Sequence, residues 1–67
     1  MKTILREARE KARLTQEQLA DKVGVARQTI LFLEKGQYNP SLRLAFRISR
    51  VLRVPVEKLF SFDDELK

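Results

Sequence analysis

The chain has 67 residues, which suits one domain (residues 1–67) whose small core buries only about 60% of the unfolded surface. It contains no cysteine and no histidine, which excludes disulfides, the usual zinc ligands and histidine general bases, so we expect no enzyme activity, no metal and no cofactor. The net charge of +5 (14 Lys and Arg, 9 Asp and Glu) favours a polyanionic partner; the last seven residues carry a net −2, and that acidic end is expected to lie away from such a partner.

Charged residues interrupt the N-terminal segment Met1–Glu7 too early for a secretory signal. No run of about 18 apolar residues follows, so the sequence predicts no membrane span. We therefore expect a cytoplasmic protein.

Apolar residues recur at helical spacing between about Thr3 and Ala12, and Arg9 falls on the same stripe. A buried cation is costly unless it is paired, so a facing helix is expected to supply a carboxylate. Glu34 is the candidate, because it lies at the edge of the core face of the third predicted helix. The alternative is that the head group of Arg9 simply reaches solvent.

A helix-turn-helix is predicted over about residues 16–35. Thr15 and Gln18 have the spacing of a capping box, so the second helix is expected to begin at about Gln16 and to end near Val23. Gly24 can adopt the left-handed conformation that a tight exit requires. In such a motif the second helix of the pair presents its outer face to a DNA major groove.

The third helix is predicted from about Arg27 to Lys35, with Gly36 after its end. At about 100° per residue, Ile30 and Leu33 define its core direction. Exposed apolar side chains on the opposite face would either contact a partner or cover an element not yet placed. The residues that point broadly outward are Gln28, Leu31, Phe32 and Lys35.

The remaining elements are also helical. Ser41 is a plausible N-cap for a helix over about Leu42–Leu52, whose apolar set is wider than one stripe and predicts more than one packing neighbour. Pro55 suits the first position of a short fifth helix. The alternation in Phe60–Phe62 is compatible with a short C-terminal strand. The fold class is therefore all-α, as a five-helix bundle.

The outward face of the third helix carries groups that can read base pairs. Glutamine can bond adenine at two positions and arginine can do so with guanine, which nominates Gln28 and Arg27; Phe32 can contact a thymine methyl group. Taken singly, each polar residue is equally well explained as a solvated side chain, but their position on one face favours double-stranded DNA as a partner. The candidate DNA-binding residues are Gln16, Arg27, Gln28, Thr29, Phe32, Lys35, Gln37, Tyr38, Asn39 and Arg43.

Six segments at fixed spacing follow a known family pattern: Leu14–Ala20, Val23–Val25, Arg27–Ile30, Leu33–Gly36, Tyr38–Leu42 and Leu59–Phe60. With these segments the sequence resembles the lambda-repressor-like (Cro/C1-type, XRE) helix-turn-helix family, and within it the small stand-alone regulators that include the cytolysin repressor. The resemblance implies a repressor that binds a palindromic operator as a homodimer, with the third helix in the major groove. It also implies a structural ion pair between Arg9 and Glu34, and a dimer interface that includes Val56, Leu59 and Phe62.

Four positions depart from the family pattern. Ala26 lacks the side-chain acceptor that usually caps the third helix, at a cost of about 1 kcal/mol. Arg13 and Arg53 replace glycines that often follow a helix, so these turns are reshaped or mildly strained. Phe32 replaces a small or polar residue, so the operator preference of relatives is not carried over.

A second hypothesis is an antitoxin-like protein-interaction module in which DNA binding is secondary. It would use exposed Leu31 and Phe32, or the segment Val56–Phe62, as a docking patch. The sequence predicts no small-molecule effector, because the chain has no second domain to house one.

Overall fold

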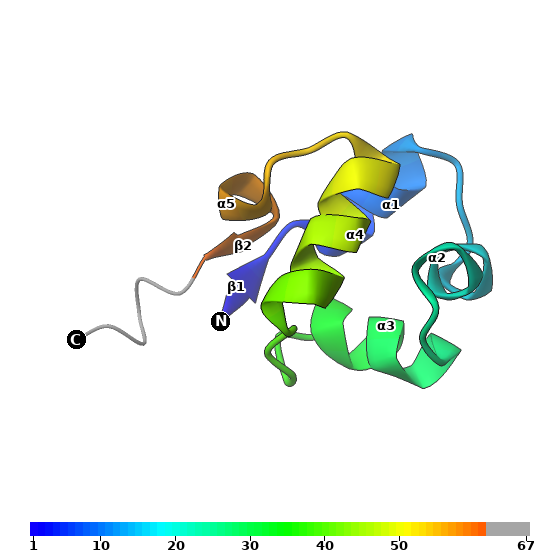
Figure 1. Ribbon diagram of the computed structural model, residues 1–67. Coiled ribbons are helices and arrows are strands. Elements are labelled where there is room, and N and C mark those ends of the chain that lie inside the picture. The colour runs from blue at the N-terminus through cyan, green and yellow to red at the C-terminus, as the bar shows by residue number, and fades with distance from the viewer. Residues whose placement is uncertain (62–67) are drawn as a thin grey trace.

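The computed structural model describes residues 1–61, which form five helices and a small two-stranded sheet (Figure 1). The second and fourth helices have the expected bounds, and the third ends one residue earlier than predicted. The first helix is shorter than predicted, because residues before it form a strand. In chain order the elements are β1 (Lys2–Thr3), α1 (Leu5–Lys11), α2 (Gln16–Val23), α3 (Arg27–Glu34), α4 (Leu42–Leu52), α5 (Val56–Leu59) and β2 (Phe60–Ser61).

The strand β1 lies beside the last described strand, so the two ends of the described chain are neighbours in space. It pairs with β2 in antiparallel register, with Lys2 opposite Ser61 and Thr3 opposite Phe60. The Thr3 hydroxyl donates to the carbonyl oxygen of Leu59 at 2.8 Å and accepts from a backbone N–H at the start of α1 at 3.0 Å. Thr3, predicted as the start of the first helix, therefore belongs to the sheet.

The ends of α2 and α3 are fixed locally. The capping box is present, because Thr15 accepts from the backbone N–H of Gln18 and the Gln18 side chain accepts from that of Thr15. Gly24 ends α2 with a φ of 75°. After α3, Gly36 has a φ of 70°, and the N–H of Gln37 donates to a carbonyl of the last helical turn at 3.0 Å, which completes a Schellman motif.

Two arginines adopt the left-handed conformation that glycine often supplies. Arg13 has a φ of 60° and Arg53 a φ of 58°. The turns after α1 and α4 thus keep their left-handed residue despite the substitution. Each such residue is mildly strained, because its Cβ crowds the following carbonyl oxygen.

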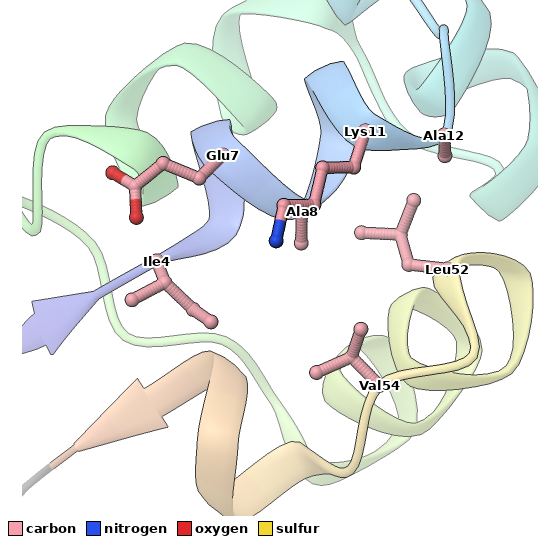
Figure 2. A pocket seen from close by; sticks show the side chains of 7 residues that line it. All are labelled: Ile4, Glu7, Ala8, Lys11, Ala12, Leu52 and Val54. Carbon is pink, nitrogen blue, oxygen red and sulfur yellow. The ribbon is translucent and has the colours of Figure 1, made fainter.

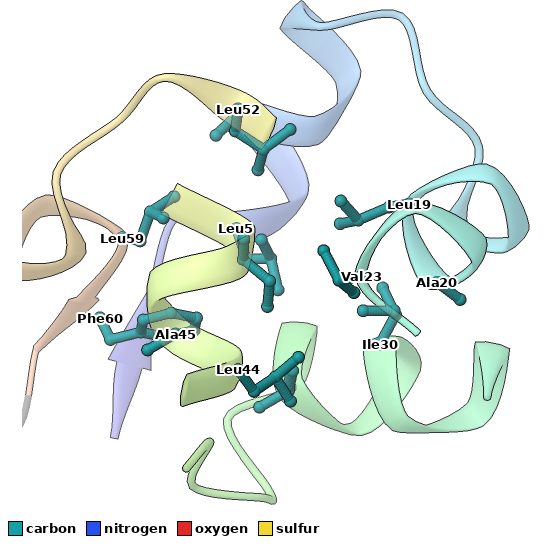
Figure 3. Close-up of a cluster of buried hydrophobic side chains, with 13 residues drawn as sticks. Leu5, Leu19, Ala20, Val23, Ile30, Leu44, Ala45, Leu52, Leu59 and Phe60 are labelled. Atoms are coloured by element: carbon teal, nitrogen blue, oxygen red, sulfur yellow. The ribbon is translucent and has the colours of Figure 1, made fainter. Parts of the chain in front are cut away.

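Every helix contributes to one hydrophobic core, which lies around α4 (Figure 3). Pro55 is the N-cap of α5 rather than its first helical residue. The short α5 still buries Leu59 completely, so it covers one end of the core. The largest fully buried side chains are Leu5, Leu19, Val23, Ile30, Leu33, Ile48 and Leu59.

Candidate nucleic-acid interface

The position of α3 is set by its packing against α2 across a short turn. Ala20 is 1% exposed, and its small side chain allows close approach of the two helices. Ile30 and Leu33 are fully buried and fix the rotation of α3 about its own axis. Arg47, which sequence analysis did not single out, donates from Nη1 to the carbonyl oxygen of Val23 at 3.4 Å, so α4 also holds the end of α2.

The opposite face of α3 is open to solvent within the described part of the chain. Arg27, Gln28 and Lys35 are exposed, and Phe32 is 39% exposed. This arrangement agrees with the face predicted from helical periodicity. A large aromatic side chain on a helix face without a covering element is available for contact with a partner.

Leu31 lies at the edge of that open face. It is half-buried and lines a small depression beside α1, together with Arg6 and Glu10. Leu31 is therefore less exposed than the neighbouring outward-facing residues, because α1 lies beside this edge of α3.

The predicted ion pair between α1 and α3 is present and buried. Arg9 donates from Nε to Glu34 Oε2 at 2.6 Å, and the two side chains are 11% and 5% exposed. Arg9 also donates from Nη1 to the carbonyl oxygen of Leu14 at 2.7 Å. One guanidinium therefore ties α1 to both α3 and the turn that leads into α2, and the alternative in which Arg9 simply reaches solvent is wrong.

Gln16 is the third member of this network. Its Nε2 donates to Glu34 Oε1 at 3.0 Å, so the first side chain of α2 is oriented by the same carboxylate that binds Arg9. The amide keeps its oxygen and a second N–H for another partner. No sequence signal indicates this bond, because it joins residues 18 positions apart on different helices.

The remaining candidate DNA-binding residues lie on the flank of α3 and in the segment that follows it. Thr29 is half-buried at its flank. Tyr38 is 48% exposed in the loop between α3 and α4. The others, which are all exposed, are Gln37, Asn39 and Arg43. Cationic and hydrogen-bonding groups thus continue from the end of α3 into the start of α4.

The candidate dimer residues that the structure describes differ in how deeply they are buried. Leu59 is fully buried in the core of the monomer, so its prediction as an interface residue is wrong in this conformation. Val56 is half-buried, and Phe62 lies outside the described residues. The acidic end of the chain lies outside them too, so its expected position away from the DNA stays a prediction. Two other apolar residues one helical turn apart are exposed instead: Leu42 at 72% and Phe46 at 56%.

A shallow groove of about 440 Å³ lies between α1 and the end of α4, as Figure 2 shows. Ile4 and Val54 form part of its apolar wall, while Glu7 and Lys11 carry charge to its edge. The groove opens beside α1 and is lined by no residue of α3. It therefore does not belong to the candidate DNA surface.

The described part of the chain offers no group of three or more acidic, cysteine or histidine side chains arranged to hold a metal ion. Within the same residues, none of the helices has the length and apolar character needed to cross a membrane.

Comparison with known proteins agrees with the fold and the motif. Residues 5–59 match the helix-turn-helix family model HTH_3. An uncharacterized HTH-type transcriptional regulator of Archaeoglobus fulgidus is 63% identical over 65 residues, which cover 97% of this chain and 93% of the relative. YgzD of Bacillus subtilis, described in the same words, is 40% identical over 65 residues, covering 97% and 98%.

A solved structure supports the same assignment. The restriction-modification controller protein C.AhdI from Aeromonas hydrophila superposes with a TM-score of 0.75 at 36% identity, over 84% of this chain and 85% of that one. The relatives above are described as transcriptional regulators. The chain belongs to the Cro/C1-type helix-turn-helix family of DNA-binding transcriptional regulators.

Proposed function

We propose that this protein binds specific DNA sequences by inserting α3 into the major groove. The observation that carries the proposal is the division of α3 into a fully buried face and an exposed face that presents Arg27, Gln28 and Phe32. Arginine and glutamine can each bond a base edge at two positions, and Phe32 can pack against a thymine methyl group. These three residues are the proposed base readers.

The proposed phosphate contacts flank the base readers on both sides. Gln16 lies at the start of α2, where backbone N–H groups and the positive end of the helix dipole attract an anion. Its bond to Glu34 holds the amide in place for that contact. The remaining proposed contacts, which fix register without reading sequence, are Thr29, Lys35, Gln37, Tyr38, Asn39 and Arg43.

The active species that we propose is a homodimer on a palindromic operator, with two copies of α3 about 34 Å apart in successive major grooves. The exposed pair Leu42 and Phe46 supports an additional apolar interface, because large apolar side chains on an open helix face favour burial against a partner. Val56 and Phe62 remain interface candidates. Occupation of a promoter by such a dimer blocks polymerase, so repression in the cytoplasm is the simplest mode of action.

Selection of bound fragments from a random DNA library, followed by binding at several salt concentrations, tests this function. We expect an enriched inverted repeat and an affinity at least about a thousandfold tighter than for random DNA. Equal affinity for every sequence would contradict specific regulation. An enriched single half-site, together with a monomer in sedimentation at working concentrations, would contradict the dimer alone.

The second candidate is a protein-interaction module, which the exposure of Leu42 and Phe46 also favours. Purification of the chain from a native extract distinguishes the two. A stoichiometric partner that survives high salt would support the interaction module, whereas a homodimer that binds its operator without another protein would support the regulator.

A further inference from the structure

The depression beside Leu31 has a volume of about 220 Å³ and lies between α1 and α3. Two of the proposed phosphate contacts line it: Gln16 at the start of α2 and Lys35 at the end of α3. From α1, Arg6 and Glu10 complete its edge. A DNA phosphate bound near Gln16 or Lys35 therefore brings its negative charge next to these two side chains of α1.

The lining of the depression has a net positive charge. Arg9 and Glu34 belong to it, but they neutralise each other across a distance of 2.6 Å. The charges that remain are the cations of Arg6 and Lys35 and the carboxylate of Glu10, so two positive charges and one negative charge leave +1. A concave surface with an excess positive charge attracts an anion such as a phosphate group.

The ion pair between Arg6 and Glu10 is weak enough to open. The distance from Arg6 Nε to Glu10 Oε2 is 3.5 Å, and both side chains are largely exposed. An exposed pair of this kind contributes little to stability, because water screens the two charges. The guanidinium can instead donate two parallel N–H bonds to a phosphate, which is a stronger arrangement. Exchange of Glu10 for a phosphate would therefore improve the contacts of Arg6.

We propose that Arg6 binds a phosphate of the DNA backbone and that Glu10 competes with this phosphate for the guanidinium. The proposal rests on the DNA-binding function above and extends the contact surface to α1, which carries none of the DNA contacts proposed there. A backbone contact fixes position without reading bases, so Arg6 strengthens binding to every sequence equally. Glu10 lowers this general affinity and leaves the preference for the operator unchanged.

The variant Arg6→Gln measures the contact. Affinity for operator and for random DNA should fall by about three- to tenfold at low salt, and the salt slope should decrease by about 1, because one phosphate contact is lost. Lys11→Gln is the matched control: it removes one exposed cation from the same helix, but Lys11 lines the groove between α1 and α4 (Figure 2). This control should leave the salt slope unchanged. Equal losses of affinity and slope in the two variants would overturn a direct contact.

The variant Glu10→Gln measures the competition. It frees the guanidinium of Arg6, so the affinity for every DNA sequence should rise by about two- to fivefold, and this gain should nearly vanish in an Arg6→Gln background. Glu7→Gln is the matched control, because Glu7 is an exposed carboxylate of α1 that lines the other groove (Figure 2). An equal gain with and without Arg6 would indicate simple repulsion between Glu10 and DNA, and would overturn the competition.

A measurement on the unmodified chain does not depend on the folding of any variant. The side-chain Nε–H signal of Arg6 in nuclear magnetic resonance should shift when DNA is added. A shift caused by inorganic phosphate but not by DNA would assign the depression to a free anion and overturn the proposal.

Failure of the proposed function and failure of this inference are distinguishable. If the chain binds no DNA sequence preferentially, the proposed function fails, while the effect of Arg6→Gln on random DNA still reports the contact. If operator selection succeeds and Arg6→Gln behaves like Lys11→Gln, only the inference about Arg6 fails.

Discussion

The two faces of α3 differ in what determines their geometry. On the inner face, Ile30 and Leu33 are fully buried and Glu34 is held by Arg9 and Gln16. On the outer face, Gln28 is exposed and Phe32 keeps 39% of its surface in solvent. The inner residues never reach a ligand, yet they decide which side chains the helix presents. Changes on the two faces should therefore affect different measurements: stability on one side and sequence-specific binding on the other.

The largest effect is expected from Arg9→Ala, which breaks the inner face. It leaves Glu34 buried without its cation, so the free energy of unfolding should fall by about 3–5 kcal/mol, as measured by chemical denaturation. Arg6→Ala is the matched control, because Arg6 and Glu10 form an ion pair on the same helix at 3.5 Å with side chains 70% and 55% exposed. This control should cost at most about 1 kcal/mol. Similar losses in the two variants would remove the distinction between the faces.

Gln28→Ala tests the outer face. It should weaken operator binding by about 1–3 kcal/mol, leave binding to random DNA nearly unchanged and leave the unfolding transition where it was. Lys35→Ala is the comparison, because loss of a phosphate contact should weaken binding to all sequences and reduce the salt slope by about 1. If Gln28→Ala weakens operator and random DNA equally, Gln28 is not a base reader.

The end of α3 can be compared with the end of α2. Gly24→Ala and Gly36→Ala both force a side chain into the left-handed region, which costs about 1–2 kcal/mol of stability. Gly36→Ala should cost more, because its Cβ would meet the Met1 carbonyl oxygen, whereas the nearest atom at Gly24 is Arg47 Nη1 at 3.6 Å. Thermal denaturation of both variants ranks them, and the reverse order would mean that the N-terminal strand yields freely.

The smallest effect is expected at the start of α3, where Ala26 makes no side-chain cap. Ala26→Ser supplies an acceptor for a backbone N–H of the first turn and should raise the free energy of unfolding by about 1 kcal/mol. Thr15→Ala, which removes the existing cap of α2, should lower it by a similar amount. A destabilising Ala26→Ser would show that the turn before α3 cannot accommodate the cap.

Local signals predicted the helices well. The capping box at Thr15 and the flexible Gly24 lie next to the residues whose conformation they set, and α2 accordingly begins and ends where expected. The strand β1 was missed, because a two-residue strand has no periodicity and is defined only by partners 57 and 59 residues away. The partial burial of Leu31 was missed for a related reason: helical periodicity gives direction around one axis but does not give the position of a neighbouring helix.

The same limit applies to the candidate site. The pairing of Arg9 with Glu34 followed from the cost of burying a lone cation, whereas the bond from Gln16 to Glu34 needed the distance between two helices. The burial of the apolar residues considered for an interface could not be predicted locally, because solvent exposure depends on the whole monomer. Leu59 packs in the core, while Leu42 and Phe46 are exposed.

By itself, the sequence determined the helix-turn-helix, the core-facing side of α3 and the need to pair Arg9, because each follows from local spacing and from the energetic cost of burying charge. Only the tertiary structure decided which apolar residues stay exposed, which side chain orients Gln16 and which strand pairs with β1. Those features depend on contacts between residues far apart in the chain, and such contacts exist only after the helices have packed around α4.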